Sequence, residues 1–222
     1  ILPSRPKSVY YSRDIVDWGM MGNNEIGDCT TAASAHSIMS WTDDNKRLYT
    51  PTTGDAVAAY SAITGYNPSR PQYDPGAYCL DVLNYWRKTG IADHKINSYV
   101  QINHKSSKEI EWSIDLFGLV YIGINMPLSA MYQENRWAVG HNLIGQNAPG
   151  SWGGHCVLAT GFGPDGFDII TWGKRISMTW NFWYCYVDEA YAILSDDFIS
   201  NGKAPNGFDL AALQNDLKLI VA

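Results

Sequence analysis

The sequence predicts an α+β fold in which a helical N-terminal part packs against an antiparallel sheet. Helix-type patterns are concentrated in the first half of the 222 residues, and strand-type patterns follow from about residue 119. Hydrophobic residues make up 45% of the chain, which is enough for a substantial core. We expect one domain over 1–222, with a helical part at about 20–118, a sheet-rich part at about 119–200 and a cleft between them.

The N-terminal third predicts an arm followed by two helices. Residues 1–20 contain two prolines and are expected to form an extended arm that packs on the sheet-rich part. A run of small residues predicts a buried helix that begins at Cys29, is capped by Asp28 and ends near Trp41. Apolar spacing over Thr53–Thr64, with Gly65 as its stop, predicts the second helix.

Two more helices and a long loop complete the first half. The loop from Gly65 to Gly76 contains three prolines and is long enough to carry function. Leu80–Lys88 predicts a third helix, because its apolar residues fall on one stripe. Ser106 and Glu109 have the spacing of a capping box, which predicts a fourth helix that ends near Phe117.

The second half is expected to form most of the sheet. Gly161–Gly166 predicts the tight turn of a hairpin, and residues 180–190 predict a short aromatic helix or turn. A C-terminal helix is expected at about 208–217. The segments expected to be strands are residues 96–102, 119–125, 155–160, 167–172 and 191–195.

Composition excludes several classes of function. The net charge is −6 and no basic run is present, which argues against a nucleic-acid partner. No apolar run approaches the roughly 20 residues of a membrane span. The four cysteines lack metal-ligand spacing, so we expect neither a metal nor a cofactor, and they do not require disulfides. The first residues do not resemble a signal peptide, so a cytoplasmic location and a processed secreted form both stay open.

Cys29 and His155 are the candidate reactive groups. At the start of a helix, the dipole and the unpaired N–H groups favour a thiolate over a thiol. His155 opens the predicted hairpin, from which its imidazole can accept the thiol proton if the two parts of the chain meet. His36 lies about 10 Å along the helix from Cys29, too far for proton transfer, and is expected in the core or on the cleft floor. Cys156 faces away from His155 on its strand and is expected to be buried; Cys79 and Cys185 are expected to be packed thiols.

The order of these motifs resembles that of the papain-like cysteine peptidases over most of the chain. Leu2 to Trp18 resembles the mature N-terminus of that family, and Asn23 to Cys29 resembles its Gln-to-Cys segment. Asp74-Pro75-Gly76-Ala77-Tyr78 resembles its Asn-Gly-Gly-Tyr loop. His155 to Gly163 resembles its His-Ala-Val segment, and Trp172-Gly173 resembles part of its Asn-Ser-Trp-Gly motif. The resemblance implies a two-lobed papain-like fold with the active site between the lobes.

The resemblance also implies roles for individual residues. Cys29 matches the nucleophile, His155 matches the general base, and the side-chain amide of Asn23 matches the oxyanion donor. Gly76, with Ala77 beside it, matches the part of the cleft that binds substrate backbone. Further substrate contacts are expected from Gly154 in the glycine-rich approach loop and from Trp172, which matches an indole that shields the partner of the histidine.

Several positions depart from the family pattern. The orienting asparagine is replaced by Ile170, which cannot accept a hydrogen bond, so Thr171 is predicted to orient His155 in its place. Asp28, the residue before the cysteine, would oppose a thiolate unless capping turns it away. Ile26 and Asp74 occupy positions where the family pairs two cysteines, which removes one reason to assume secretion.

Three functions follow as hypotheses. The first is a cysteine peptidase or amidase that forms a thioester on Cys29 with a peptide or amide substrate. The second is a catalytically inactive papain-like binding module, because the orienting asparagine is missing. The third is a cell-wall amidase or acyltransferase that uses the same Cys–His pair. The fold alone does not choose a substrate among them.

Overall fold

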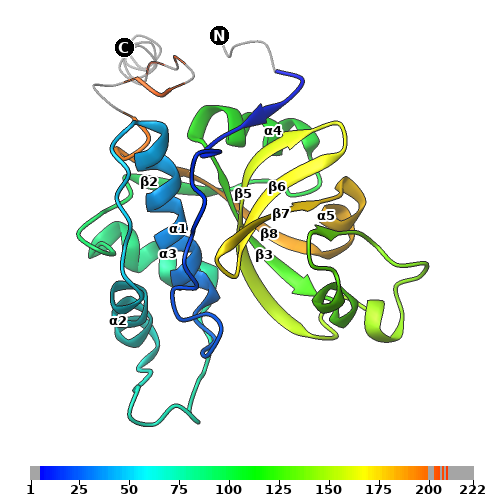
Figure 1. The fold of residues 1–222 in the computed structure, drawn as a ribbon, viewed down its shortest axis with the longest axis horizontal. Coiled ribbons are helices and arrows are strands. Elements are labelled where there is room, and N and C mark those ends of the chain that lie inside the picture. Colours follow the sequence, from blue (N-terminus) through cyan, green and yellow to red (C-terminus); the bar gives the residue numbers. More distant parts are fainter. Residues whose placement is uncertain (1–5, 200–202, 206, 208, 210–222) are drawn as a thin grey trace, which may run out of the picture.

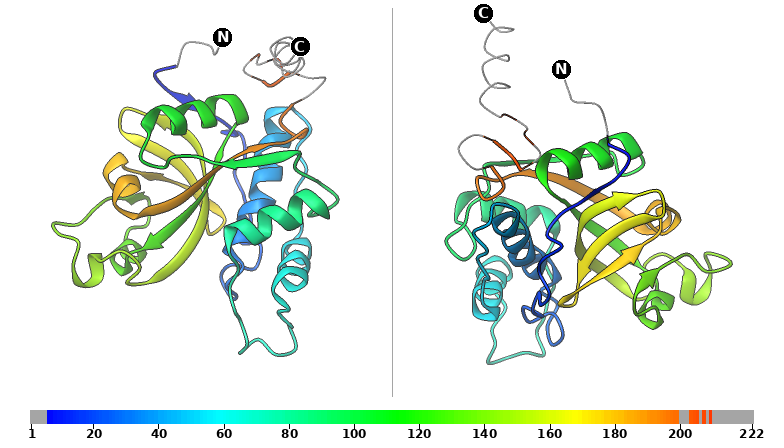
Figure 2. Two further views of the ribbon diagram at one scale, coloured as in Figure 1. Left: turned by 180° about the vertical axis from the view of Figure 1, so that it is seen from behind. Right: turned by 45° about the horizontal axis from the view of Figure 1, so that its top comes forward.

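The computed structural model describes residues 6–199, 203–205, 207 and 209 (Figure 1). The expected C-terminal helix and the first residues of the family-like N-terminus lie outside this part of the chain. Three helices from the first half lie together on one side of a strongly curved sheet, and both views of Figure 2 show the same two-part arrangement. The α+β prediction is therefore confirmed, with a helical lobe and a sheet lobe.

The elements follow one another in the order expected, with additional short strands in the sheet lobe. The helices are α1 Cys29–Asp44, α2 Thr53–Thr64, α3 Cys79–Lys88, α4 Ser107–Phe117 and α5 Trp180–Tyr186. The strands are β1 Val9–Tyr10, β2 Ser98–Gln101, β3 Val120–Met126, β4 Arg136–Trp137, β5 Gly153–Gly163, β6 Gly166–Thr171, β7 Lys174–Met178 and β8 Val187–Leu194. Two 3-10 helices, Leu128–Tyr132 and Gly145–Asn147, precede β5.

Helix α1 is buried along almost its whole length, although many of its residues are serine or threonine. Two of these hydroxyl groups donate back to carbonyl oxygens one turn earlier: Ser34 to Thr30 at 3.1 Å and Ser37 to Ala33 at 2.9 Å. These bonds satisfy the hydroxyl groups without any external partner. The small side chains therefore allow α1 to run against the sheet, where it contacts β5 and places its N-terminus at the cleft.

The ends of α2 and α4 follow their local sequence signals. Thr52 and Asp55 form a complete capping box at the start of α2, and Gly65 ends that helix in the left-handed conformation with φ +77°. Ser106 accepts a hydrogen bond from the Glu109 amide at the start of α4. Strong capping is therefore why these helices were predictable to within one residue at each end.

The sheet has the strand order β2-β8-β3-β5-β6-β7-β4, and β1 pairs with the outer part of β5. All pairs are antiparallel except β4 with β7, which is parallel. The N-terminal arm thus joins the sheet through β1. The division at about residue 118 stays a prediction; α4 and β2, which precede it, lie with the sheet, since α4 packs against β3, β5 and β8.

Strands β3 and β5 separate two hydrophobic cores. Tyr121 and Leu158 face α1 and belong to the core between the two lobes. Ile122 and Val157, their neighbours along the strands, face the inside of the curved sheet and belong to a second core with α4 and α5. The alternation follows from the period of two along a strand, and it places consecutive residues of β5 on opposite sides of the sheet.

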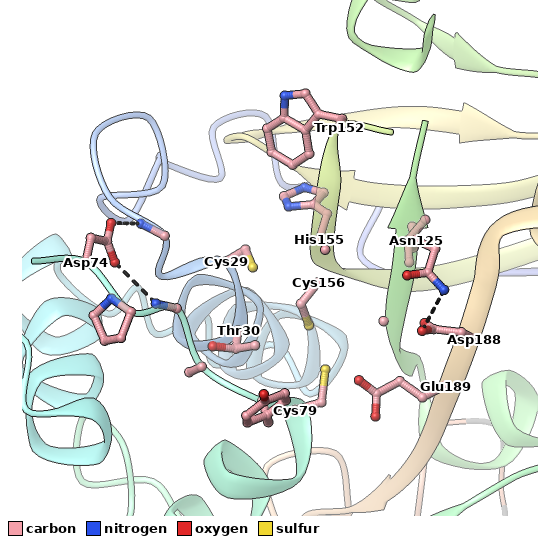
Figure 3. A pocket seen from close by; sticks show the side chains of 18 residues that line it. Cys29, Thr30, Asp74, Cys79, Asn125, Trp152, His155, Cys156, Asp188 and Glu189 are labelled. Atoms are coloured by element: carbon pink, nitrogen blue, oxygen red, sulfur yellow. Dashed lines mark hydrogen bonds between the residues drawn. The ribbon is translucent and has the colours of Figure 1, made fainter. Parts of the chain in front are cut away.

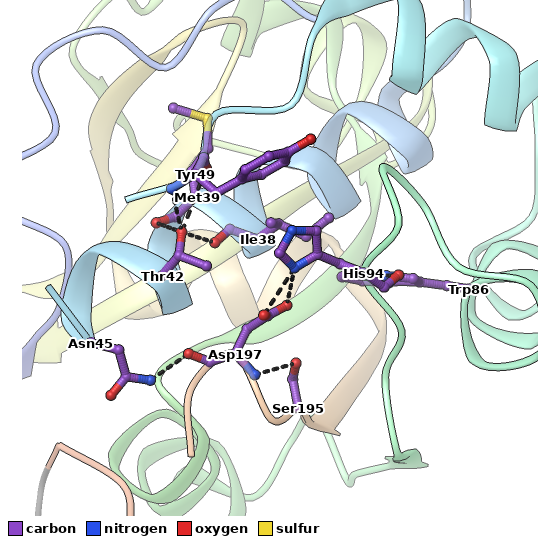
Figure 4. A network of polar contacts seen from close by, with 9 residues as sticks. All are labelled: Ile38, Met39, Thr42, Asn45, Tyr49, Trp86, His94, Ser195 and Asp197. Atoms are coloured by element: carbon purple, nitrogen blue, oxygen red, sulfur yellow. Dashed lines mark hydrogen bonds and ion pairs between the residues drawn. The ribbon is translucent and has the colours of Figure 1, made fainter. Parts of the chain in front are cut away.

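A polar network fastens the segment after β8 to the helical lobe (Figure 4). The His94 imidazole bonds the Asp197 carboxylate at 2.8 Å, and the Asn45 side chain donates to the Asp197 carbonyl oxygen. The Trp86 indole N–H donates to the His94 carbonyl oxygen at 3.1 Å. These contacts connect the end of α1, the turn after α3 and the end of the sheet, at positions remote from one another in the sequence.

Strands β4 and β7 were not expected from the sequence, and the segment before residue 191 also differs from its prediction. Residues 180–190 were expected to form one aromatic helix or turn, but the helix ends at Tyr186 and β8 begins at Val187. The aromatic run ends where the helix ends, and the backbone of residues 187–190 pairs with β3 instead. This correction matters for the cleft, because Asp188 and Glu189 belong to the newly assigned part of β8.

Candidate active site

A cleft of about 570 Å³ lies between the two lobes, and both Cys29 and His155 line it (Figure 3). The start of α1 and the loop before α3 form its helical wall, and strands β3, β5 and β8 form its sheet wall. The lining residues are Gly27, Cys29, Thr30, Asp74, Pro75, Gly76, Ala77, Tyr78, Cys79, Gly123, Ile124, Asn125, Trp152, Gly154, His155, Cys156, Asp188 and Glu189.

Cys29 is the first residue of α1, and its half-buried thiol reaches the cleft from the helical wall. Burial raises the pKa of the thiol to about 12, because the charged thiolate loses contact with water. The Cys156 backbone lowers that pKa in part, and the Asp28 carboxylate raises it. At neutral pH the free site therefore holds a protonated thiol, in spite of the favourable position at a helix N-terminus.

Asp28 does not cap α1 through its side chain, contrary to the sequence prediction. The carboxylate is fully buried under the preceding loop, where a Cβ atom added to Gly22 would lie 2.8 Å from its Oδ2 atom. Burial raises the pKa of Asp28 to about 7, and the Asn23 side chain lowers it in part. A carboxyl group that is half protonated near neutral pH thus adjoins the Cys29 thiol.

Asp74 connects the two loops of the helical wall. Its carboxylate accepts a hydrogen bond from the Gly27 backbone N–H at 2.6 Å and another from the Tyr60 hydroxyl. That hydroxyl in turn accepts from the Gly76 backbone N–H at 2.8 Å. The resemblance places one of two paired cysteines at the position of Asp74. Hydrogen bonds of the Asp74 carboxylate therefore connect two loops that a disulfide would connect in the family pattern.

His155 is held at the sheet wall by one hydrogen bond and by aromatic packing. Its Nε2 atom lies 2.8 Å from the Thr171 hydroxyl oxygen. The Trp172 ring stacks on the imidazole with a centroid distance of 4.4 Å and an interplanar angle of 17°. Burial lowers the pKa of His155 to about 3, so the imidazole is neutral at physiological pH.

Two further tryptophans complete the surroundings of the imidazole and were missed by the sequence analysis. The Trp137 and Trp152 rings make edge contacts with His155 at centroid distances of 6.4 and 5.8 Å. Trp137 lies on the short strand β4, 18 residues before His155, and Trp152 lies in the loop that leads directly into β5. No local pattern marks them, although the high count of nine tryptophans indicated that aromatic residues would line a cleft or core.

The substrate-contact residues expected from the sequence divide into two groups. Gly76, Ala77 and Gly154 line the cleft. Trp172 does not line it and instead stacks on His155. Asn23, the expected oxyanion donor, is also absent from the cleft lining, and its amide nitrogen lies 3.2 Å from the Ile26 carbonyl oxygen. The catalytic roles of all these residues stay predictions.

The remaining thiols and the second histidine differ in their relation to the cleft. Cys79 and Cys156 are both buried, yet both line the cleft floor, where their side chains point toward one another (Figure 3). Cys185 is half-buried on α5, and none of the four cysteines forms a disulfide. His36 is buried away from the cleft lining, where its Nε2 atom lies 2.9 Å from the Gly19 carbonyl oxygen.

The described part of the chain shows neither a metal-binding cluster nor a membrane-spanning helix. No group of three or more histidine, cysteine, aspartate or glutamate residues there has the geometry to hold a metal ion. None of the described helices combines the length and apolarity required to cross a bilayer.

Comparison with known proteins gives structural matches only. No protein-family model and no curated protein matches the sequence. Xylellain, a cysteine protease from Xylella fastidiosa, matches with a TM-score of 0.68 at 15% identity, over 86% of this chain and 87% of that one. The Carica candamarcensis cysteine protease CMS1MS2, solved with E-64, matches with a TM-score of 0.60 at 14% identity, over 86% and 99% of the two chains.

The bromelain protease from Ananas comosus, also solved with an E64 inhibitor, matches with a TM-score of 0.60 at 12% identity, again over 86% and 99% of the two chains. Three matched proteins from a bacterium and two plants thus share the two-lobed architecture over most of their length. The chain therefore has the fold of the papain-like cysteine proteases, with a sequence that has diverged far from those of the matched structures.

Proposed function

We propose that this protein is a cysteine peptidase or amidase that forms a thioester with its substrate on Cys29. One observation carries the proposal: a thiol at the start of a helix and a neutral imidazole line the same cleft from opposite walls. A nucleophile and a base that share a cleft with room for a peptide satisfy the first requirement of covalent acyl transfer. The E-64 complexes of two fold relatives are consistent with a peptide-like ligand.

The first step is proton transfer followed by attack. When the Thr171 hydroxyl accepts from Nε2–H, the lone pair of His155 lies on Nδ1 and accepts the Cys29 proton. The sulfur attacks the substrate carbonyl carbon, a C–S bond forms, and the carbonyl electron pair moves to the oxygen. Because both resting groups are uncharged, bound substrate has to promote this transfer by placing a carbonyl at the sulfur, so that proton transfer and attack occur together.

The oxyanion requires hydrogen-bond donors beside Cys29. The Cys29 backbone N–H is in the first turn of α1, where amides lack intrahelical acceptors. The Asn23 amide is the second proposed donor, and it has to turn from the Ile26 carbonyl oxygen toward the cleft when substrate binds. Removal of one such donor typically costs about a hundredfold or more in rate.

Collapse of the intermediate completes acylation. The C–N bond breaks, the imidazolium of His155 gives its proton to the leaving amine, and a thioester remains on Cys29. Water then attacks the thioester with His155 as its base, which releases the carboxylic acid and restores the thiol. Transfer to an amine in place of water would use the same groups.

An inactive binding module is the second candidate, because two observations oppose an easily formed thiolate. Burial raises the pKa of Cys29, and the Asp28 carboxylate adjoins it. A protein that only binds peptides in the cleft needs no reactive sulfur, whereas a peptidase does. The two candidates therefore differ in one measurable property, the reactivity of Cys29 in the presence of His155.

The test is alkylation by iodoacetamide, with the labelled cysteine identified by peptide mass spectrometry. The peptidase hypothesis expects labelling of Cys29 in the wild type and at least about tenfold slower labelling in His155→Ala, because the base is lost. Cys185→Ala is the matched control, since this half-buried thiol lies outside the cleft lining. Labelling of Cys29 that is equally slow in wild type and His155→Ala, together with no turnover of an amide library, would favour the binding module.

A further inference from the structure

The charged side chains that line the cleft are all acidic. Its described lining contains three carboxylates, Asp74, Asp188 and Glu189, and no lysine or arginine. The Asp74 carboxylate already accepts hydrogen bonds within the helical lobe, from the Gly27 N–H and the Tyr60 hydroxyl. The other two carboxylates belong to consecutive residues of β8, at the opposite wall; Figure 3 shows Glu189 near Cys79 at the cleft floor and Asp188 beside Asn125. The sheet wall is therefore the part of the cleft whose negative charge is open to a ligand.

Glu189 reaches the cleft because the neighbouring strand carries no side chain beside it. In the sheet, Gly123 of β3 pairs with Glu189 on one side and with Cys156 of β5 on the other. A Cβ atom at Gly123 would lie 2.5 Å from the Cγ atom of Glu189 and 2.6 Å from its Oε1 atom. The Glu189 side chain thus lies over Gly123. Glu189, Gly123 and Cys156 form one row across three neighbouring strands, and Cys156 follows His155 in the sequence.

These carboxylates have no cationic partner in the described part of the chain. Glu189 Oε2 accepts a hydrogen bond from the Tyr191 hydroxyl at 2.7 Å, and Asp188 accepts from the Asn125 amide at 2.9 Å. None of the described ion pairs includes either residue. Glu189 is half-buried, so water screens its charge less than that of an exposed carboxylate.

A second polar group in the same cleft lacks a partner. Thr30 follows Cys29 on α1 and lines the cleft, and its side chain is only 2% exposed. Its hydroxyl oxygen has no hydrogen-bond partner among the described residues. A buried hydroxyl group without a partner is costly, and a ligand with several N–H donors relieves that cost.

We propose that the cleft selects peptide substrates that carry an arginine or lysine side chain, whose charge lies over Gly123 against Glu189, with Asp188 beside it. The inference rests on the proposed function, because it names the substrate class of the same cleft. A cation there restores charge balance on the sheet wall, whereas a neutral side chain leaves the half-buried glutamate without a counter-charge. Acidic side chains are repelled by the same carboxylates.

The test measures binding separately from catalysis. Cys29→Ala removes the nucleophile, so equilibrium binding of short fluorescent peptides to this variant does not depend on acyl chemistry. Peptides with arginine at each of three positions before the scissile bond are compared with partners that carry neutral citrulline, which has nearly the same shape. We expect arginine at one position to bind about tenfold or more tighter than citrulline.

Variants that each remove one negative charge show whether Glu189 causes the preference for arginine. Glu189→Gln in the Cys29→Ala background is expected to bring the two peptides to within about twofold of one another. Asp165→Asn removes the same formal charge from the β5–β6 turn, roughly 25 Å along the sheet from His155, and is expected to keep the preference. Should Glu189→Gln fail to fold, the salt dependence of the preference in Cys29→Ala alone serves instead, because screening by 0.5 M salt is expected to shrink it.

The outcomes separate this inference from the proposed function. Equal binding of arginine and citrulline peptides, a preference that survives Glu189→Gln, or an equal loss in Asp165→Asn would overturn the inference. If Cys29 is unreactive but the arginine preference depends on Glu189, the peptidase proposal fails and the cation site stands. If wild-type protein cleaves neutral and cationic peptides equally well through Cys29, the peptidase stands and the cation site fails.

Discussion

The two walls of the cleft hold their candidate reactive groups in different ways. On the helical wall, Cys29 is placed by the start of α1 and by loops that Asp74 joins through hydrogen bonds. On the sheet wall, His155 is placed by three indole rings and a single hydrogen bond to Thr171. The position of the sulfur thus depends on the start of a helix and on hydrogen bonds between loops, whereas the position of the imidazole depends mainly on the packing of aromatic side chains around it.

The largest effect is expected on the sheet wall, from Trp172→Ala. Loss of the stacked ring should lower the free energy of unfolding by about 3 kcal/mol, toward the lower end for a tryptophan because the side chain is only half-buried. Water then reaches the imidazole, so the pKa of His155 should rise from about 3 toward its ordinary value near 6.5. Denaturant unfolding and an NMR titration of the histidine ring protons measure the two effects.

Trp180→Ala is the matched control for that experiment. Trp180 is also half-buried, but it contacts Phe167 and Tyr184 and is not one of the rings around His155. It should lower stability without any change in the titration of His155. An unchanged pKa in Trp172→Ala would show that aromatic packing does not govern the imidazole.

The next effect concerns a charge under the helical wall. The pKa of Asp28 is raised to about 7, so between about pH 4 and pH 7 the folded protein binds a proton that the unfolded chain does not. Its contribution to stability is therefore greatest in acid and is lost as pH rises. Between pH 5 and pH 8 the wild type should lose about 2.5 kcal/mol more stability than Asp28→Asn. Denaturant midpoints at both pH values, for both proteins, give this difference.

Asp28→Asn is also expected to change the reactivity of the Cys29 thiol. Asp28→Asn removes a negative neighbour, so the pKa of the Cys29 thiol should fall and alkylation at pH 8 should become faster. Parallel stability curves for wild type and variant would mean that Asp28 is ionised and compensated in the folded protein.

A smaller loss is expected from Asp74→Ala, which separates the loops of the helical wall. A hydrogen bond to a charged group contributes about 1.5–3 kcal/mol, so stability should fall by about 2 kcal/mol and peptide binding should weaken. Tyr60→Phe tests half of the arrangement, because it breaks the link to Gly76 and leaves the Gly27 bond in place. Asp81→Asn, at an exposed carboxylate on α3, is the control. Equal stability of Asp74→Ala and wild type would refute the tethering role.

The smallest effect is expected from Thr171→Val, which keeps the shape and removes the hydroxyl. Peptidase activity should fall by about tenfold, because the imidazole loses the group that fixes its orientation, while stability changes little. Thr171→Ser should restore most of the rate. If Val and Ser variants are equally active, Thr171 does not orient His155.

The comparison of the two walls also explains which features the sequence predicted. The boundaries of α2, with its capping box and Gly65, follow from adjacent residues and agreed with expectation. The cap predicted for Asp28 was wrong, because the loop at Gly22 buries the carboxylate, and no local rule describes that packing. The order of the motifs and the resemblance to papain-like peptidases led us to expect Cys29 and His155 on one cleft, and both line it, although their catalytic roles stay predictions.

The sheet wall was harder to predict, because its residues come together only through long-range strand pairing. Trp137 lies on a two-residue strand that pairs with β7, and neither element was expected. Glu189 was hidden in a segment interpreted as helix or turn, since the aromatic run before it concealed the start of β8. Its place in the cleft depends on Gly123, a pairing partner that is distant in the sequence.

The most direct test of the central claim is detection of the acyl group on Cys29. The protein is mixed with a peptide ester, quenched in acid within milliseconds to seconds, and analysed by mass spectrometry. The account predicts a mass increase equal to the acyl part of the peptide, located on Cys29, absent from Cys29→Ser and strongly reduced in His155→Ala. An ester that is hydrolysed while Cys29 never carries the acyl group, or an equal adduct in His155→Ala, would contradict it.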